Sequence, residues 1–213
     1  DGRFISFESL ATNLVANDTN NVGDIFVHDR QTGETTRVSV ASDGTQANGN
    51  SSFSSLSADG HFIVFGSSAS TLVANDTNNA TDIFVHDRLT GETTRASVAS
   101  DGTQADNSSA LSYVSEDGRY IAFGCSATNL IANDTNSVAD AFVHDRLTGE
   151  TTRVSVASDG TQANGNSGAS SLSDDGRYVL IYSGATNLVA NDTNDFYDIF
   201  VHDRQTGQTT RVS

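Results

Sequence analysis

The sequence repeats itself every 58 residues. Alignment on its Asp-Gly pairs gives three complete units and a partial fourth, and residues 1–39 agree with residues 175–213 at 29 of 39 positions. Periods of this length are typical of stacked or circular arrays of one supersecondary unit. The four units of the predicted domain, residues 1–213, are residues 1–58, 59–116, 117–174 and 175–213.

Each unit contains four segments typical of strands, separated by turn residues. The first is short and rich in serine, as in residues 52–57. The second, residues 61–65 in the second unit, is apolar on both faces, which is typical of a strand buried between two layers. The third and fourth, residues 24–30 and 34–40 in the first unit, are joined by a Thr-Gly turn. No segment predicts a helix.

Four antiparallel strands per unit, with both sheet faces buried and a regular repeat, predict an all-β fold, a β-propeller of four-stranded blades. About four blades are expected. The chain begins at the second strand of its first blade, so that blade lacks its inner strand and 15 strands are predicted. The missing strand comes either from preceding sequence in a larger ring, of which the chain is a fragment, or from another chain.

The repeat carries a family resemblance. Its pattern "DGRYxxFxSxATNLVANDTNxxxDxFVHDRxTGETTRVSV" resembles the TolB-type β-propeller repeats of secreted and periplasmic bacterial proteins. The Asp-Gly turn, the Asp-Ile-Phe-Val strand and the Thr-Gly hairpin carry this resemblance over the whole chain, although the proline common in such repeats is absent. The resemblance implies a propeller and an extracellular or periplasmic location. It does not choose among binding platforms, docking domains and accessory domains of hydrolases.

Charge and composition exclude several classes of partner. A formal net charge of −16 argues against nucleic acid, whose phosphates are bound by Lys and Arg. The same charge disfavours anionic membrane surfaces. No apolar run approaches the roughly 18 residues that membrane insertion requires.

No constellation of residues predicts catalysis. One histidine recurs on the third strand of every unit, and in a propeller these four side chains lie in separate blades and cannot meet on one reacting atom. The aspartate after each histidine is expected to accept backbone N–H groups in the hairpin. The sequence lacks a nucleophile elbow, a phosphate loop and a zinc-binding cysteine pattern. We therefore predict that the chain is not an enzyme.

Two loop segments are candidate binding surfaces. In the linker between units, Gly44 and Gly49 are expected to adopt positive φ, and neighbouring Asn and Ser side chains to cap local backbone. Positions 21–23 and their equivalents vary between units, either as a diversified binding surface or as an unconstrained loop. Phe196 and Tyr197 occupy these positions in the fourth unit, and exposed aromatic residues are favoured at interfaces.

One loop per unit has the composition of a calcium site. An Asp-x-Asn-x-x-x-Asp pattern places three oxygen donors at positions 1, 3 and 7. Calcium takes six to eight oxygen ligands, so backbone carbonyls and water would complete the shell. The alternative is a set of Asx turns without metal, because the pattern lacks the Gly and Glu of an EF-hand. The predicted ligands are Asp18, Asn20, Asp24; Asp76, Asn78, Asp82; Asp134, Asn136, Asp140; and Asp192, Asn194, Asp198.

The sequence thus favours a non-enzymatic extracellular or periplasmic scaffold that binds a protein or glycan, with calcium stabilising its loops. Two alternatives stay open: an accessory propeller of a larger secreted hydrolase, and a structural surface protein that assembles with itself. The incomplete first blade is the expected place for self-association.

Calcium binding predicts a change in stability. An ion that binds only the folded state stabilises it by RT ln(1 + [L]/Kd), so millimolar calcium should raise the melting temperature above that in excess chelator. Substitution of Asp18→Ala together with Asp76→Ala should reduce the rise. A thermal melt of both proteins measures it, and an unchanged melting temperature in the parent would leave the loops as turns.

Overall fold

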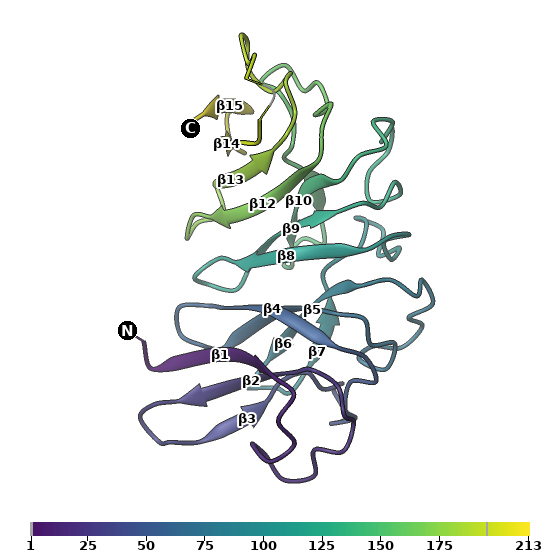
Figure 1. Ribbon diagram of the computed structural model, residues 1–213, viewed down its shortest axis with the longest axis vertical. Coiled ribbons are helices and arrows are strands. Elements are labelled where there is room, and N and C mark those ends of the chain that lie inside the picture. The colour runs from purple at the N-terminus through teal and green to yellow at the C-terminus, as the bar shows by residue number, and fades with distance from the viewer. Residues whose placement is uncertain (1, 195) are drawn as a thin grey trace.

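The computed structural model describes residues 2–194 and 196–213. Its regular elements are 15 strands in four antiparallel sheets, which confirms the all-β prediction. Figure 1 shows how the sheets are arranged. None of the described residues forms a helix long and apolar enough to cross a membrane. Asp1, which begins the first predicted Asp-Gly turn, and Asp195, at a variable loop position, lie outside the described residues.

The sheets follow the chain in order. The first, β1-β2-β3, has three strands, and the others, β4 to β7, β8 to β11 and β12 to β15, have four. The strands are β1 Phe4–Ser9, β2 Asp24–Asp29, β3 Thr35–Arg37, β4 Ser51–Leu56, β5 Phe62–Ser67, β6 Asp82–Asp87, β7 Thr93–Arg95, β8 Ser109–Val114, β9 Tyr120–Cys125, β10 Asp140–Asp145, β11 Thr151–Arg153, β12 Ser167–Leu172, β13 Tyr178–Ser183, β14 Asp198–Asp203 and β15 Gln208–Arg211.

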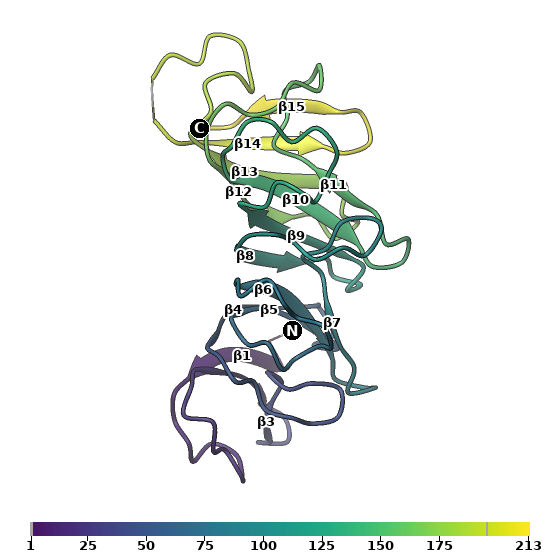
Figure 2. The same cartoon turned by 90° about the vertical axis from the view of Figure 1, so that its right-hand side faces the viewer.

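Each sheet is a propeller blade with its inner strand at one edge. Figure 2 shows the inner strands β4, β8 and β12 along one side of the stack and β7 and β11 along the other. The first sheet lacks the inner strand, so β1, its second-type strand, lies at that edge. The first and fourth blades lie at opposite ends of the stack in Figure 1, which makes the molecule an open arc of blades.

The outer strand of each blade is shorter than the sequence predicts. In the first blade it ends at Arg37 instead of continuing to Val40. The reason is that the Ser39 hydroxyl accepts the Ile25 N–H at 3.1 Å, in the place where a backbone carbonyl would continue the ladder. Ser97 and Ser155 take the same role in the next two blades.

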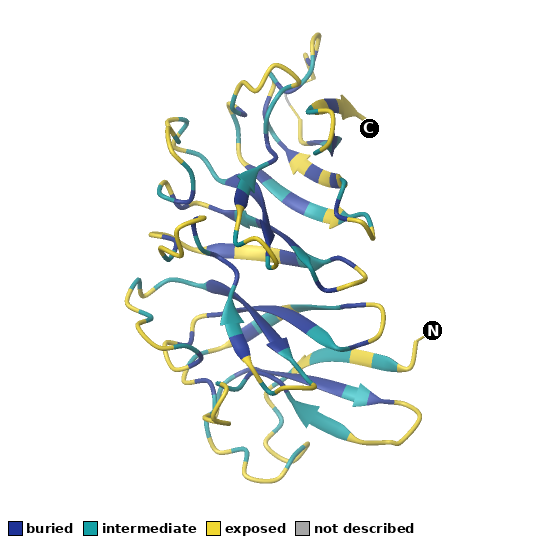
Figure 3. Cartoon of the chain, turned by 180° about the vertical axis from the view of Figure 1, so that it is seen from behind, coloured by how far each residue is buried: buried dark blue, intermediate teal, exposed yellow. Residues whose placement is uncertain are grey.

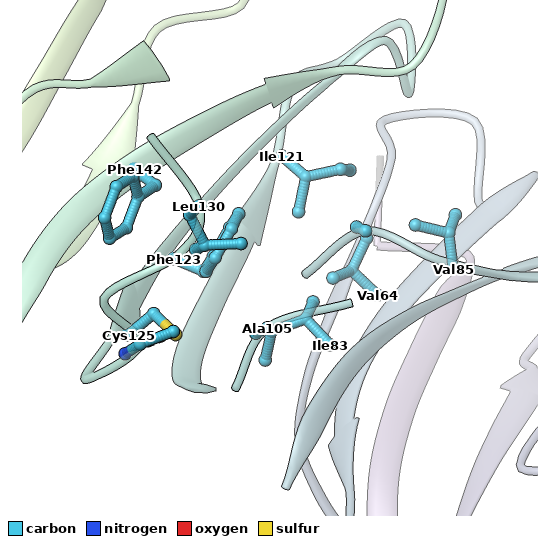
Figure 4. Close-up of a cluster of buried hydrophobic side chains, with 11 residues drawn as sticks. Val64, Ile83, Val85, Ala105, Ile121, Phe123, Cys125, Leu130 and Phe142 are labelled. Atoms are coloured by element: carbon cyan, nitrogen blue, oxygen red, sulfur yellow. Dashed lines mark hydrogen bonds between the residues drawn. The ribbon is translucent and has the colours of Figure 1, made fainter. Parts of the chain in front are cut away.

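The core consists of interfaces between neighbouring blades. In Figure 4, Val64 and Val85 of the second blade lie opposite Ile121 and Phe142 of the third, and Cys125 lies in the same cluster. Equivalent clusters join the first blade to the second and the third to the fourth. Strands β5 and β9 are therefore buried on both faces, as predicted.

A contact between an aromatic ring, a glycine and an arginine, which we call the aromatic junction, joins each blade to the next. The ring at the start of a blade's second strand packs against the glycine of the following Asp-Gly turn, and an arginine lies over the ring. For Phe62 the glycine is Gly118 and the arginine Arg146, whose guanidinium carbon is 4.3 Å from the ring centroid. The other two junctions are Phe4–Gly60–Arg88 and Tyr120–Gly176–Arg204.

The two linker glycines differ in their roles. Gly44 adopts φ +84°, as predicted. Gly49 does not have positive φ, so that prediction is wrong; a Cβ there would lie 2.8 Å from the carbonyl carbon of Ser68. Close approach to a neighbouring loop, and not an unusual φ, requires glycine at this position.

The aromatic junction predicts that two glycines of similar φ differ in how much stability is lost when each is replaced by alanine. Gly118 (φ +74°) would place a Cβ 2.0 Å from Phe62 Cδ2, whereas Gly149 (φ +76°) would place its Cβ in open space. Both Gly→Ala substitutions cost about 1–2 kcal/mol of backbone strain. Gly118→Ala should cost about 1–3 kcal/mol more, because it overpacks the junction. Urea unfolding of both variants measures the difference, and equal losses would contradict the junction's role.

Candidate functional site

The structure brings the three predicted ligands of each loop together. Each loop connects the second and third strands of a blade, and its last aspartate begins the third strand. In the first blade Asn20 Nδ2 donates to Asp24 Oδ2 at 2.8 Å, so the amide directs its N–H2 group and not its oxygen to the carboxylate. The same bond forms in the other blades, at Asn78–Asp82, Asn136–Asp140 and Asn194–Asp198.

An arginine lies among these carboxylates in every blade. Arg37 Nη1 is 2.9 Å from Asp18 Oδ1 and 3.5 Å from Asp24 Oδ2, and its side chain is 9% exposed. A guanidinium at this distance neutralises both acids inside the blade. The equivalent groups are Arg95 with Asp76 and Asp82, Arg153 with Asp134 and Asp140, and Arg211 with Asp192 and Asp198.

A serine completes the hydrogen bonding of the inner aspartate. Ser155 Oγ donates to Asp140 Oδ1 at 2.6 Å, and it also accepts the Ala141 N–H. Burial raises the pKa of Asp134 in the same loop, and the Arg153 charge opposes that rise. The buried acids are thus held by hydrogen bonds and a permanent cation, as buried charges require.

The sequence contained a signal for this arginine. Every unit carries Thr-Thr-Arg in its fourth strand, so Arg37 and its equivalents recur with the same period as the aspartates. The described residues contain no group of three or more His, Cys, Asp or Glu side chains placed to hold a metal ion. Calcium binding stays a prediction. Each predicted site contains two carboxylates, one asparagine and an arginine that pairs with the carboxylates.

His86, His144 and His202 each connect neighbouring blades through a threonine. His144 Nδ1 lies 2.9 Å from Thr151 Oγ1, which itself donates to the Val98 carbonyl at 2.6 Å. The threonine has one hydrogen to give, so His144 Nδ1 must be the donor. The acceptor carbonyl lies in the linker that precedes the third blade. Burial lowers the pKa of His144, as it does for His86 and His202.

The aspartates after the histidines accept hairpin N–H groups, as predicted. Asp29 Oδ1 accepts the Gln31 N–H at 2.9 Å. Arg3 forms a bidentate pair with the same carboxylate, at 3.0 and 2.7 Å, a contact that the sequence analysis missed. His61 replaces this arginine in the second blade, with Nε2 2.6 Å from Asp87 Oδ1. These acids thus have local structural partners.

Two inner strands contain a large apolar residue with positive φ. Phe53 on β4 and Leu111 on β8 have φ values of 54° and 53°, at irregularities in the pairing of these strands with their neighbours. Residues other than glycine, asparagine and aspartate adopt this conformation at a cost of about 1–2 kcal/mol. Both side chains are nevertheless solvent-accessible, Phe53 at 62% and Leu111 at 43%. Strained backbone of this kind clusters at functional sites, which makes these two positions candidates for one.

Two hollows adjoin these side chains. One, of about 220 Å³, lies between β4 and β8 and is lined by Phe53, Leu111 and Tyr113. The other, of about 260 Å³, extends from Leu111 toward Gly168 and a pair of tyrosines. The rings of Tyr182 and Tyr197 stack at 4.5 Å in that pair, so the variable loop of the fourth unit contributes to the second hollow. We call Phe53, Leu111 and the two hollows the inner-strand surface.

Comparison with known proteins identifies the fold. A scan of protein-family models and a comparison with curated protein sequences give no match. Solved structures give matches over nearly the whole chain. TolB from Acinetobacter baumannii has a TM-score of 0.56 at 18% identity, covering 99% of this chain and 41% of that chain. A putative TolB from Agrobacterium tumefaciens has a TM-score of 0.59 at 14% identity, covering 99% and 61%.

A protease-associated propeller is similar in fold. The β-propeller domain of the Trilobed protease from Pyrococcus furiosus has a TM-score of 0.57 at 13% identity, covering 100% of this chain and 54% of that chain. This chain spans about two fifths to three fifths of these three structures. The likeness establishes the propeller fold.

Removal of the arginine among the carboxylates should lower the free energy of unfolding strongly. Arg153→Gln would leave Asp134 and Asp140 buried without a cation, and breaking a buried ion pair in this way costs about 3–5 kcal/mol. Arg119→Gln is the control. Arg119 pairs with Asp145 but has 36% of its side chain exposed, so this variant should lose less unfolding free energy than Arg153→Gln. Equal losses of unfolding free energy for the two variants in urea would refute the structural role of Arg153.

Proposed function

From its TolB-type propeller fold, we propose that this chain is a non-enzymatic extracellular or periplasmic scaffold that binds a protein partner through the inner-strand surface. The observation that supports this proposal is the strained, exposed placement of Phe53 and Leu111 beside two hollows. Each hollow has the size of a side chain and not of a large ligand. An apolar side chain of a protein partner fits this surface better than a polar sugar does.

The chemistry of the described residues supports binding over catalysis. The four recurrent histidines lie in separate blades and bond to threonines, and His61 lies against Asp87. Cys125 is buried, and burial raises the pKa of its thiol, which keeps it a poor nucleophile. The aspartates of the four loops are held by arginines in like environments, whereas acid and base roles need unlike ones.

An accessory role beside a hydrolase is the second candidate. It is favoured by the likeness to the propeller domain of the Trilobed protease and to acylaminoacyl peptidase, of which this chain covers 54% and 31%. A hydrolase motif elsewhere in the encoding reading frame would support it. Further propeller repeats alone would favour the scaffold.

Binding at the inner-strand surface predicts the composition of peptides selected from a library. Peptides selected against the parent chain should carry a bulky apolar residue, since burying one such side chain contributes about 1.5–3 kcal/mol. Leu111→Gly removes that contact and should weaken binding at least about tenfold, which is about 1.4 kcal/mol. The same substitution relieves positive-φ strain, so its melting temperature should not fall. Fluorescence anisotropy and a thermal melt measure the two effects.

A neighbouring glycine substitution provides the control. Ala169 is the equivalent residue of the third inner strand, is buried and lacks positive φ, so Ala169→Gly should lose stability and keep the affinity. Peptides that bind Leu111→Gly and Phe53→Gly as tightly as the parent would refute the inner-strand surface. Binding on a glycan array, with no peptide selected, would refute the protein partner.

A further inference from the structure

The hollow between β4 and β8 contains a buried hydroxyl without a partner. Ser112 of β8 lines this hollow and is 4% exposed. Its Oγ forms no hydrogen bond among the described residues. Figure 3 shows β8, near the middle of the stack, with an exposed stretch between buried residues, and Leu111 belongs to that stretch. An exposed apolar side chain and an unpaired hydroxyl are therefore neighbours on one strand.

The equivalent hydroxyl of the preceding blade does have a partner. Ser54 of β4 occupies the position of Ser112, and its Oγ donates to Ser6 Oγ of β1 at 2.9 Å. The residue equivalent to Ser6 in the second blade is Val64, which has no hydroxyl to offer. The chain therefore satisfies Ser54 internally and leaves Ser112 without a hydrogen bond.

An unpaired hydroxyl beside a hollow indicates a place for a ligand group. A buried polar group without a hydrogen bond lowers the stability of a fold, and such groups are rare. No hydrogen bond holds the Ser112 side chain in one rotamer, so its hydroxyl can turn toward a group that enters the hollow. A polar atom of that group would supply the missing hydrogen bond.

The walls of the hollow decide which group fits. Phe53, Leu111 and Tyr113 provide apolar surface, and the volume is about 220 Å³. The entering group therefore needs an apolar body with one polar atom at its end. Tyrosine has this form, and its hydroxyl both donates and accepts, so it can pair with a serine in either direction. Phenylalanine lacks the oxygen, and the indole N–H of tryptophan only donates.

We propose that the hollow between β4 and β8 receives a tyrosine side chain of the protein partner, whose ring packs on Phe53 and Leu111 and whose hydroxyl bonds to Ser112 Oγ. This contact rests on the proposed function, because it requires a protein partner at the inner-strand surface. It adds the residue type that the surface selects. Tyrosine is among the residues that contribute most to binding at protein interfaces.

Thermal melts of the free chain test whether the hydroxyl is unpaired. Ser112→Ala removes a group without a partner, so its melting temperature should equal or exceed that of the parent. Ser54→Ala is the matched comparison, because it breaks the hydrogen bond to Ser6 and should melt below the parent. A melting temperature of Ser112→Ala below that of the parent would mean that Ser112 has a partner within the chain, and would overturn the proposal.

Peptides test the contact itself. Peptides selected against the parent are screened for weaker binding to Phe53→Gly, since Phe53 lines the hollow between β4 and β8 and not the second hollow. The tightest of these is synthesised with tyrosine, phenylalanine or tryptophan at its bulky position, and fluorescence anisotropy measures the affinity. The parent should bind the tyrosine form about tenfold more tightly than the phenylalanine form.

Two serine variants locate the hydrogen bond. Ser112→Ala should bind the tyrosine and phenylalanine forms equally, because it loses affinity for tyrosine alone. Ser55→Ala is the control, since Ser55 lines the same hollow but is only half-buried and should keep the preference of the parent. A preference for tyrosine that survives in Ser112→Ala, or that is lost in Ser55→Ala, would overturn the role of Ser112.

The outcomes also separate this contact from the proposed function. Peptides that bind at the inner-strand surface with no preference for tyrosine, or none of which is weakened by Phe53→Gly, would overturn the tyrosine contact and leave a protein partner in place. A library that yields no binding peptide would overturn both.

Discussion

Each sheet of this chain is three or four short strands wide and too small to bury a core alone, so it is stabilised by packing against the neighbouring blades. That constraint explains the placement of the bulky residues. Faces such as that of Val64 and Val85 pack on the next blade, and the aromatic junctions fix the angle at which blades meet. The arginine that covers each ring also bonds the glycine carbonyl behind it, so one side chain serves packing and polar satisfaction together.

The fold could be predicted because period and alternation are local properties of the sequence. Fifteen strands and the missing inner strand follow from turn spacing and apolar patterning. Contacts between side chains distant in the sequence could not be read in this way. The pairing of Arg3 with Asp29 joins residues 26 apart, and the role of His61 becomes visible only when it occupies the position of Arg3 in another blade.

The candidate site was predicted in part. The loop pattern correctly placed Asp18, Asn20 and Asp24 together, but oxygen donors at suitable spacing do not reveal which cation lies beside them. Arg37 comes from another strand, and its period was the available clue. The positive φ of Phe53 and Leu111 left no mark in the sequence, because strain of this kind depends on the pairing of two strands and not on residue preference. The prediction of positive φ at Gly49 was wrong for a related reason. Close contact and unusual φ both require glycine, and the sequence does not distinguish them.

The near-identity of the blades has a consequence for folding. Ser9 pairs with Asp24, 15 residues later, but an equivalent Asp82 lies 73 residues later in an almost identical strand. Loop-closure entropy favours the correct partner by only about 1.4 kcal/mol. Side chains add little discrimination, because the competing strands share the sequence Asp-Ile-Phe-Val-His-Asp. We therefore expect correct pairing to depend on the order in which the strands are synthesised. Refolding of the intact chain from denaturant should form blade-swapped species that folding during synthesis avoids.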